Sequence, residues 1–156
     1  MNDLLVSRLS PNDASALSIL LTADGNEYQQ YFIPFATDIK SLKERLASVC
    51  EDRYWGVWFE SNLAGFFMMR GFDEGYQRPS FGVYIASSHS GKGLSRLALD
   101  YCMSWCRMNH IGAMMLKVHP DNRYARQTYE KAGFTVNSTC SRTGHTIMEK
   151  HWSEGE

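Results

Sequence analysis

The sequence has little net charge and no long apolar run. Sixteen lysines and arginines nearly balance seventeen acidic residues, so the formal net charge is -1 and the isoelectric point lies near 6.5. This balance gives no electrostatic reason to expect nucleic acid or an anionic membrane as a partner. The apolar runs are far shorter than a bilayer span, and the N-terminus has neither the basic start nor the apolar region of a signal peptide. We therefore expect a cytoplasmic protein.

Cysteine is scarce, and its spacing fits no metal site. The four cysteines, Cys50, Cys102, Cys106 and Cys140, lack the paired spacing of a zinc finger. Cys102 and Cys106 share one face of a predicted helix, where a buried thiol behaves as a small apolar group. The sequence therefore predicts core cysteines and no metal centre.

The chain also lacks internal repeats, low-complexity segments and linkers. Its 156 residues, of which 44% are hydrophobic and 13% aromatic, are enough to bury one full core. We expect a single domain over residues 1–156, with a frayed tail from residue 152 onward.

The hydrophobic pattern alternates between the spacing of strands and that of helices. Apolar residues three or four apart predict helices that begin at 11–13 and then over 38–49, 93–108 and 122–132. Strands are expected over 4–9, 54–59, 63–69, 81–85, 113–118, 134–138 and 145–150, and a short turn at 60–62 predicts a hairpin. This order predicts an α/β or α+β fold with a mixed sheet.

The most informative segment is a glycine turn between a predicted strand and a predicted helix. Its letters are Ser90-Gly91-Lys92-Gly93-Leu94-Ser95, directly after the strand over 81–85. The first N–H groups of a helix have no partner within the helix, and glycine lets a phosphate approach the backbone. The turn therefore predicts an anion site, although its spacing fits neither a Walker loop nor a dinucleotide fingerprint.

A second motif follows the predicted strand over 113–118. Asn122, Ala125, Tyr129, Gly133 and Phe134 recur at fixed distances along a helical segment. Gly133 is typical of a helix C-cap, whereas Tyr129 is either an amphipathic core residue or a hydroxyl donor to the site.

Together the two segments resemble the GCN5-related N-acetyltransferases (GNAT). The turn is similar to the family's Arg/Gln-x-x-Gly-x-Gly/Ala motif, with Ser90 at the first position, Gly93 at the middle glycine and Ser95 at the last small position. The second segment matches the family's Asn-x-x-Ala-x-x-x-Tyr-x-x-x-Gly-Phe at all five letters. The replacement of Arg/Gln by Ser90 and of Gly/Ala by Ser95 predicts weaker cofactor affinity, although the Ser95 hydroxyl is suited to cap the helix or reach a phosphate.

The resemblance implies six or seven strands with about four helices, and acetyl-CoA as the acyl donor. In the family the turn amides hold the pyrophosphate, and the tyrosine hydroxyl protonates the departing thiolate, so the carry-over makes Tyr129 the general acid. Two family strands splay beside the turn, and backbone groups at the gap face the pantetheine. The implied cofactor-binding residues are Val83, Ile85, Ser90, Gly91, Lys92, Gly93, Leu94, Ser95 and Asn122.

The general base stays open at this point. An alkyl ammonium has a pKa of about 10 and must lose a proton, either to a side chain or through water, before the amine can attack. Asp73, Glu74, Tyr84 and His119 are the side chains closest in sequence to the expected cleft, and a water chain is the alternative.

The acceptor site is expected on the aromatic connection over 25–35 and the loop before the strand over 81–85. Tyr28 and Tyr31 either line a pocket for an acceptor with apolar and hydroxyl surfaces or belong to a segment pinned to the core by Phe32 and Phe35. Tyr84 is a further acceptor-site candidate. The acidic candidates, which would attract a cationic amine, are Glu27, Asp73 and Glu74.

These observations predict an N-acetyltransferase that moves an acetyl group from acetyl-CoA to a primary amine of a small molecule, an amino sugar among them, by direct attack in a ternary complex. Two alternatives stay open: a protein N-terminal or lysine acetyltransferase, and a noncatalytic acyl-CoA-binding module. Apolar surface on the late strands would also suit a homodimer.

Overall fold

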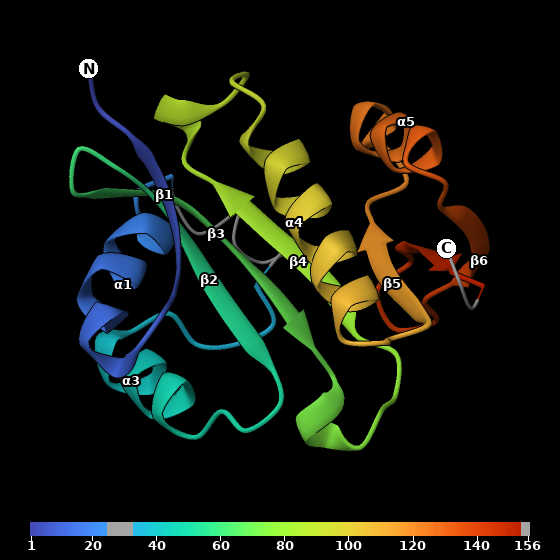
Figure 1. The fold of residues 1–156 in the computed structure, drawn as a ribbon, viewed down its shortest axis with the longest axis horizontal. Helices are drawn as coiled ribbons and strands as arrows, with labels where there is room; N and C mark the ends of the chain where they lie inside the picture. Colours follow the sequence, from blue (N-terminus) through green and yellow to red (C-terminus); the bar gives the residue numbers. More distant parts are fainter. Residues whose placement is uncertain (25–32, 154–156) are drawn as a thin grey trace.

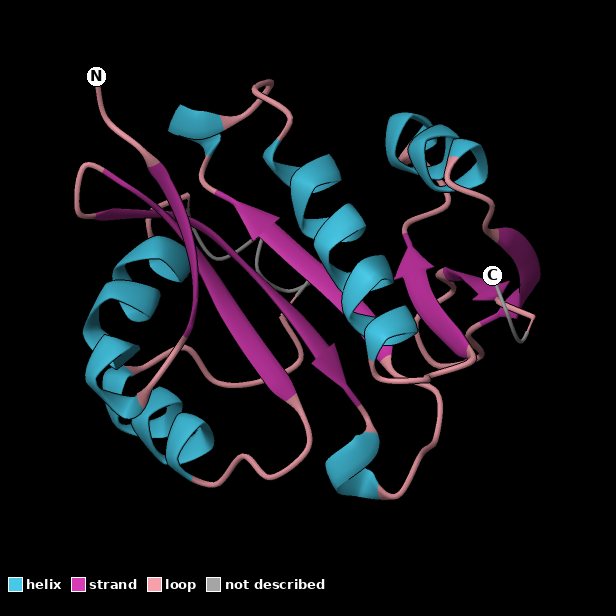
Figure 2. Ribbon diagram, viewed as in Figure 1, coloured by secondary structure: helices cyan, strands magenta, loops and turns pink. Residues whose placement is uncertain are grey.

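The computed structural model describes residues 1–24 and 33–153, in which a seven-stranded sheet carries helices on both faces (Figures 1 and 2). The strands are β1 (Leu4–Arg8), β2 (Arg53–Phe59), β3 (Asn62–Arg70), β4 (Ser80–Ile85), β5 (Ala113–Val118), β6 (Thr135–Thr139) and β7 (Thr146–His151). The α-helices are α1 (Ala14–Thr22), α3 (Ile39–Ala47), α4 (Leu94–Met108) and α5 (Arg123–Lys131). Short 3-10 turns are η1 (Pro11–Asp13), η2 (Phe72–Glu74) and η3 (Ser87–His89). No helix in these two ranges is both long and apolar enough to cross a bilayer.

The strand order is β1-β2-β3-β4-β5-β7-β6, which confirms the predicted mixed sheet. Only β4 and β5 pair in parallel, and the other neighbours are antiparallel. The predicted hairpin between β2 and β3 is also confirmed. Its two turn residues, Glu60 and Ser61, have φ angles of 53° and 64°, and positive φ at both central residues matches the twist of a two-residue hairpin.

Alternate side chains of the central strands enter two separate cores. On one face Trp55, Phe67 and Phe81 are buried against α4, together with Cys102 and Cys106 of that helix. The prediction that these two cysteines belong to the core is confirmed, and burial raises the pKa of both thiols, that of Cys106 to about 12.

The opposite face of the sheet packs against α1 and α3. Tyr54, Phe66 and Tyr84 lie here with Leu17 of α1 and Leu42 of α3, all of them buried. Because successive strand residues point to opposite faces, the side chain of Tyr84 lies on the face away from α4.

The two parallel strands separate toward their carboxyl ends. β4 and β5 pair only at Ser80 with Met115 and at Phe81 with Leu116, after which no residue of β4 has a partner on β5. Figures 1 and 2 show the strands diverging, with the start of α4 and the whole of α5 at the open end. The fold therefore opens a gap in its sheet beside the glycine turn.

Trp152, directly after the last strand, is held by contacts with the fold, so the expectation of a frayed tail is wrong at its first residue. The N–H of Trp152 donates to the carbonyl of Gly112 at 2.8 Å, and the Trp152 side chain packs against the core on the α4 face. The Lys150 ammonium lies 5.8 Å from the centre of the Trp152 ring. These contacts fasten the end of β7 to the start of β5.

Candidate functional site

The glycine turn has the backbone conformation that its two glycines permit. Gly91 and Gly93 have φ angles of +75° and +82°, in the left-handed region that other residues adopt at a cost. A Cβ atom added at either position would meet nothing within 4 Å, so the surface of the turn is open. The glycines are therefore required for backbone conformation, and they leave room for a ligand to reach the amides.

The amides of the turn are free to bind an anion. In the described ranges, the backbone N–H groups from Gly91 to Arg96 donate to no other group, and the first N–H bonded in α4 is that of Leu97, to the carbonyl of Gly93 at 3.0 Å. α4 is fifteen residues long, so its dipole adds partial positive charge at this end. The turn thus presents a row of donors at a helix N-terminus.

The side chains of the turn have different roles. Lys92 is exposed, whereas Leu94 is only 7% exposed and anchors the start of α4 in the core. The helix cap is Gly93 and not Ser95, which lies exposed in the first turn of the helix, so the expectation that Ser95 caps α4 is wrong. Ser90 closes the preceding turn, because its hydroxyl donates to the carbonyl of Ser87 at 2.9 Å.

Val83 and Ile85 direct their backbone groups into the gap. The N–H of Ala86 donates to Ala64 on β3 at 2.9 Å, and the carbonyl of Pro79 accepts from Met115 on β5 at 2.9 Å. Backbone groups alternate between the two sides of a strand, so even-numbered residues bond to β3 and odd-numbered residues face β5. Since β5 has diverged, the N–H and C=O groups of Val83 and Ile85 point into the opening.

Tyr129 is the side chain of the second motif that is suited to proton transfer. It is half-buried against the core on the α4 face, with its ring 6.0 Å from that of Phe134 at 62°. Burial raises the pKa of the Tyr129 hydroxyl to about 12, so the group carries its proton at neutral pH. Within the described part of the chain this hydroxyl makes no hydrogen bond, which leaves it available as a donor.

The other letters of the second motif form the ends of α5. Asn122 is the N-cap, and its side-chain oxygen accepts the N–H of Ala125 at 3.1 Å. Gly133 has a φ of +97°, and the N–H of Phe134 donates to the carbonyl of Tyr129 at 3.0 Å, which is the Schellman arrangement of a helix C-terminus. The prediction that Gly133 is a cap is confirmed. The cofactor contact of Asn122 stays a prediction, with its amide N–H₂ as the available donor.

Asp73 and Glu74 lie at the wrong end of the sheet for the roles proposed for them. They belong to η2, which precedes β4, whereas the glycine turn follows β4 (Figure 1). Asp73 accepts hydrogen bonds from the N–H groups of Glu51 at 2.6 Å and Cys50 at 3.1 Å, which hold its pKa below the usual range. Glu74 lies 3.7 Å from Arg70. Neither residue is placed to act as a base or to bind the acceptor.

Tyr84 lies at the correct end, in a contact that the sequence did not indicate. Its hydroxyl donates to the carboxylate of Asp24 at 2.6 Å, just after α1. Asp24 also accepts from the hydroxyl of Ser87 at 2.5 Å and from its N–H at 3.2 Å, and these bonds lower the pKa of Asp24. Sixty residues separate Asp24 from Tyr84, so no local pattern reveals the pair.

His119 follows β5 at the open end, beside a second histidine. Its Nδ1 accepts the N–H of Asp121 at 3.1 Å. The ring lies 5.5 Å from that of His145, at 62°. Burial, together with the charges of His119 and Lys117, lowers the pKa of His145, which favours a neutral imidazole at pH 7. His145 is thus a candidate that sequence reasoning missed.

The two sides of the gap present these groups to the same face. Leu116 and Val118 of β5 point into the core beneath α4, so Lys117 points to the opposite face, and His119 continues that alternation. Tyr84 on β4 lies on that same face. The structure therefore places the Tyr84–Asp24 pair and the His119–His145 pair on the same side of the sheet, away from α4.

Three of the sequence candidates lie outside the described residues. These are Glu27, Tyr28 and Tyr31, in the connection that follows Asp24. The neighbouring Phe35 packs edge-on against Tyr54 with 6.1 Å between ring centres. The interpretation that Phe35 packs against the core is thus confirmed, whereas Phe32, named with it, lies outside the described residues.

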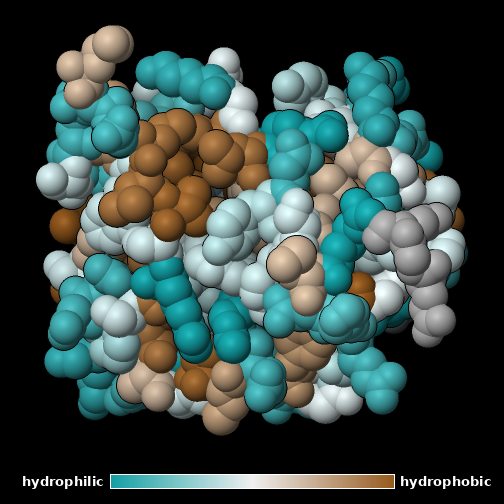
Figure 3. All heavy atoms as spheres, viewed as in Figure 1, coloured by the Kyte–Doolittle hydropathy of each residue, from teal (hydrophilic) through white to brown (hydrophobic). Residues whose placement is uncertain are grey.

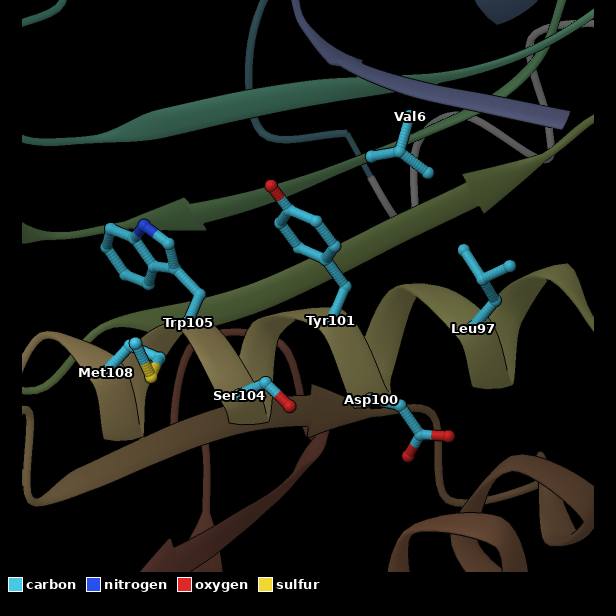
Figure 4. A pocket seen from close by; sticks show the side chains of 7 residues that line it. All are labelled: Val6, Leu97, Asp100, Tyr101, Ser104, Trp105 and Met108. Carbon is cyan, nitrogen blue, oxygen red and sulfur yellow. The ribbon is translucent and has the colours of Figure 1, made fainter.

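A separate shallow cavity of about 590 Å³ lies between β1 and α4. Figure 4 shows Leu97, Tyr101 and Trp105 of the helix facing Val6 of β1, with β5 on the other side of α4. Apolar side chains gather over this part of the surface (Figure 3). The cavity is thus separated by the helix from the gap between β4 and β5, and it is distinct from the glycine-turn site.

Comparison with known proteins agrees with this geometry. The model of the Acetyltransferase (GNAT) family matches residues 20–134. A search of curated protein sequences finds no match.

Solved structures of similar fold cover nearly the whole chain. The PaiA N-acetyltransferase from Thermoplasma acidophilum in complex with coenzyme A has a TM-score of 0.77 at 20% identity, covering 96% of this chain and 99% of that one. The ribosomal-protein-S5-alanine acetyltransferase from Vibrio fischeri has a TM-score of 0.81 at 16% identity, covering 98% and 95%. Mutant forms of the spermidine/spermine N-acetyltransferase SpeG from Vibrio cholerae have a TM-score of 0.75 at 18% identity, covering 96% and 95%.

The chain belongs to the GNAT family of acetyltransferases. It is an N-acetyltransferase that depends on acetyl-CoA as its acyl donor. The described residues fit that donor, because the unbonded amides of the glycine turn suit a pyrophosphate, and the gap beyond Phe81 exposes the backbone of Val83 and Ile85 to an extended arm.

Proposed function

We propose that this protein transfers an acetyl group from acetyl-CoA to a primary amine of a small molecule, by direct attack in a ternary complex. The observation that carries the proposal is the divergence of β4 from β5 after Phe81, directly beside the open amides of the glycine turn. The glycine turn is an anion site, and the gap beside it exposes backbone N–H and C=O groups of β4. Together they suit a long ligand with a phosphate group and an amide-rich arm.

The cofactor would supply an activated acyl group as a thioester. For this ligand we assign the amides from Gly91 to Ser95 to the pyrophosphate, with Lys92 adding positive charge. Backbone N–H groups of Val83 or Ile85 would donate to the carbonyl oxygen as negative charge develops on it. The side chains of these two strand residues pack against the core, so their substitution should affect packing first.

Tyr129 would donate its proton to the departing sulfur. A thiol has a pKa of about 8.5, so an O–H group placed to donate its proton to the sulfur speeds departure of the thiolate by roughly 100-fold or more. Tyr129 carries its proton at neutral pH, and within the described residues its hydroxyl has no hydrogen-bond partner that would compete for that proton.

The amine would approach from the face away from α4. There the carboxylate of Asp24 offers a negative charge to a cationic amine, and the neutral ring of His145 offers a proton acceptor, with a water chain as the alternative route. The far side of the gap carries Lys117 and two histidines, which is unlike the open acidic groove expected for a protein acceptor. We also propose that Tyr28 and Tyr31 line one side of this acceptor site.

The test of the catalytic proposal is Tyr129→Phe. The change removes one hydroxyl and keeps the ring contact with Phe134, so acetyl-CoA should bind unchanged while kcat falls roughly 100-fold or more. The assay is release of the CoA thiol across a panel of primary amines, with calorimetry for binding.

The matched control is Tyr124→Phe on the same helix. Tyr124 is 83% exposed, so loss of its hydroxyl should change neither kcat nor cofactor affinity. Equal activity of the Tyr129 and Tyr124 variants would overturn the role of Tyr129. Binding of acetyl-CoA without thiol release to any amine would favour the noncatalytic alternative.

A further inference from the structure

Asp24 stands at the junction between the acceptor side and the cofactor turn. It follows α1 and precedes the connection on which Tyr28 and Tyr31 lie, yet its carboxylate contacts residues near the end of β4 and in η3. It receives three hydrogen bonds, one from Tyr84 and two from Ser87. The carboxylate therefore joins segments that are distant in the sequence.

The two bonds from Ser87 continue into the glycine turn. Ser87 presents both its hydroxyl and its N–H to Asp24, at 2.5 and 3.2 Å. The carbonyl of Ser87 in turn accepts the hydroxyl of Ser90 at 2.9 Å and the N–H of Ser90 at 3.3 Å. Gly91 comes next, so the contacts run without a break from Asp24 to the first residue of the open turn.

This chain of contacts gives a role to the residue that departs from the family motif. Ser90 stands where an Arg or Gln is usual, and its short hydroxyl closes a turn onto Ser87. The orientation of the turn is therefore set from the side of Ser87, whose own position depends on Asp24. A carboxylate suits this task, because it accepts every one of the three donors that meet there.

We propose that Asp24 is a positioning residue for the cofactor turn, and that it couples the acceptor side of the enzyme to acetyl-CoA binding through Ser87 and Ser90. The inference rests on the proposed function, since it takes the glycine turn as the cofactor site. Asp24 holds the turn in the binding conformation before the ligand arrives, so its loss lowers affinity for the ligand.

The test is Asp24→Asn, with Ser87→Ala as a second variant that leaves the carboxylate and Tyr84 in place. An asparagine keeps the shape but removes the negative charge and one of the two acceptor oxygens, so the hydrogen bonds from Tyr84 and Ser87 become weaker. We expect the Kd for coenzyme A to rise about tenfold in Asp24→Asn and severalfold in Ser87→Ala. The double variant should bind no more weakly than Asp24→Asn alone, because both changes break one linkage.

The matched control is Asp38→Asn. Asp38 is also an exposed carboxylate that accepts an N–H, that of Ser41 at 3.0 Å, but it caps α3 and has no described contact with the turn. Asparagine caps a helix about as well as aspartate does, so this variant should keep its stability and bind coenzyme A like the wild-type protein. Equal affinities of the Asp24 and Asp38 variants would overturn the inference.

Hydrogen exchange without ligand separates this inference from the proposed function. The amides of Ser87, His89 and Ser90 are hydrogen-bonded, so a peptide over residues 86–96 should exchange faster in Asp24→Asn and at the wild-type rate in Asp38→Asn. Unchanged exchange in Asp24→Asn would overturn the positioning role. Faster exchange in a protein that binds no coenzyme A would support the linkage and contradict the cofactor site.

Discussion

At the scale of single residues, a motif that matches a family contains positions of different kinds. Asn122, Ala125, Gly133 and Phe134 begin, pack and end α5, and helix geometry explains each of them. Tyr129 carries a hydroxyl that the helix does not use, and Asn122 keeps its N–H₂ group beyond the capping bond. The residues that escaped sequence reasoning, Asp24 and His145, contact partners far away in the chain, and no local pattern marks such a pair.

The surroundings of the Cys140 thiol predict how its reactivity depends on pH. It lies after β6, and hydrogen bonds from the hydroxyl and the N–H of Thr143, then the N–H of Arg142 and the charge of Lys117, lower its pKa to about 7. We expect alkylation by iodoacetamide to rise with a midpoint near pH 7, because the thiolate is the reactive form. Mass spectrometry of the peptide that contains Cys140 gives the rate at each pH.

The matched variant is Thr143→Val, which removes the hydroxyl and keeps the shape of the side chain. Its loss should move the midpoint upward, toward the ordinary value for a thiol. Buried Cys106, with its pKa raised to about 12, should stay unmodified in both proteins. The same midpoint in wild type and variant would show that the Thr143 hydroxyl does not lower the pKa of Cys140.

At the scale of elements, much of the site followed from strand and helix order. The hydrophobic pattern placed β4, the glycine turn and α4 in succession, and the chain has that order. The expectation that Asp73 and Glu74 lie in the site is wrong, because nearness to β4 in the sequence does not tell which end of the strand a residue is at. The loop before β4 and the turn after it are separated by the length of the strand, roughly 20 Å. The divergence after Phe81 depends on where pairing stops, which no single strand reveals.

Two glycine substitutions should cause similar backbone strain but should differ in their effect on coenzyme A binding. Gly93→Ala and Gly75→Ala both place a Cβ at a positive φ, +82° and +94°, with nothing within 4 Å. Each should cost about 1–2 kcal/mol of stability. Only Gly93 lies in the cofactor turn, so only its variant should weaken coenzyme A binding, by tenfold or more in calorimetry.

Gly75 is the control because it follows η2, at the other end of β4. Equal affinities in the two variants would show that the turn does not hold the ligand. A loss of affinity confined to Gly93→Ala would locate the anion site at the start of α4.

At the scale of the whole molecule, one sheet separates two cores and opens between β4 and β5. The core on the α4 face supports the cofactor side, and the core under α1 and α3 supports the side from which the amine would come. Asp24 and Ser87 connect the two sides at the open end. The family and the fold were predictable from the sequence, since they depend on local motifs and on the order of elements. The identity of the amine was not, because it depends on side chains that converge from several elements.

Thermal unfolding with and without acetyl-CoA tests the central claim most directly. A ligand that binds only the native state at about 100 times its Kd stabilises it by roughly 2.7 kcal/mol, which corresponds to a rise in Tm of about 5–10 °C for a chain of this size. We predict a rise that grows with ligand concentration in the wild-type protein and is much smaller in Gly93→Ala. An unchanged Tm in the wild-type protein up to millimolar acetyl-CoA would contradict the assignment of the glycine turn as a cofactor site.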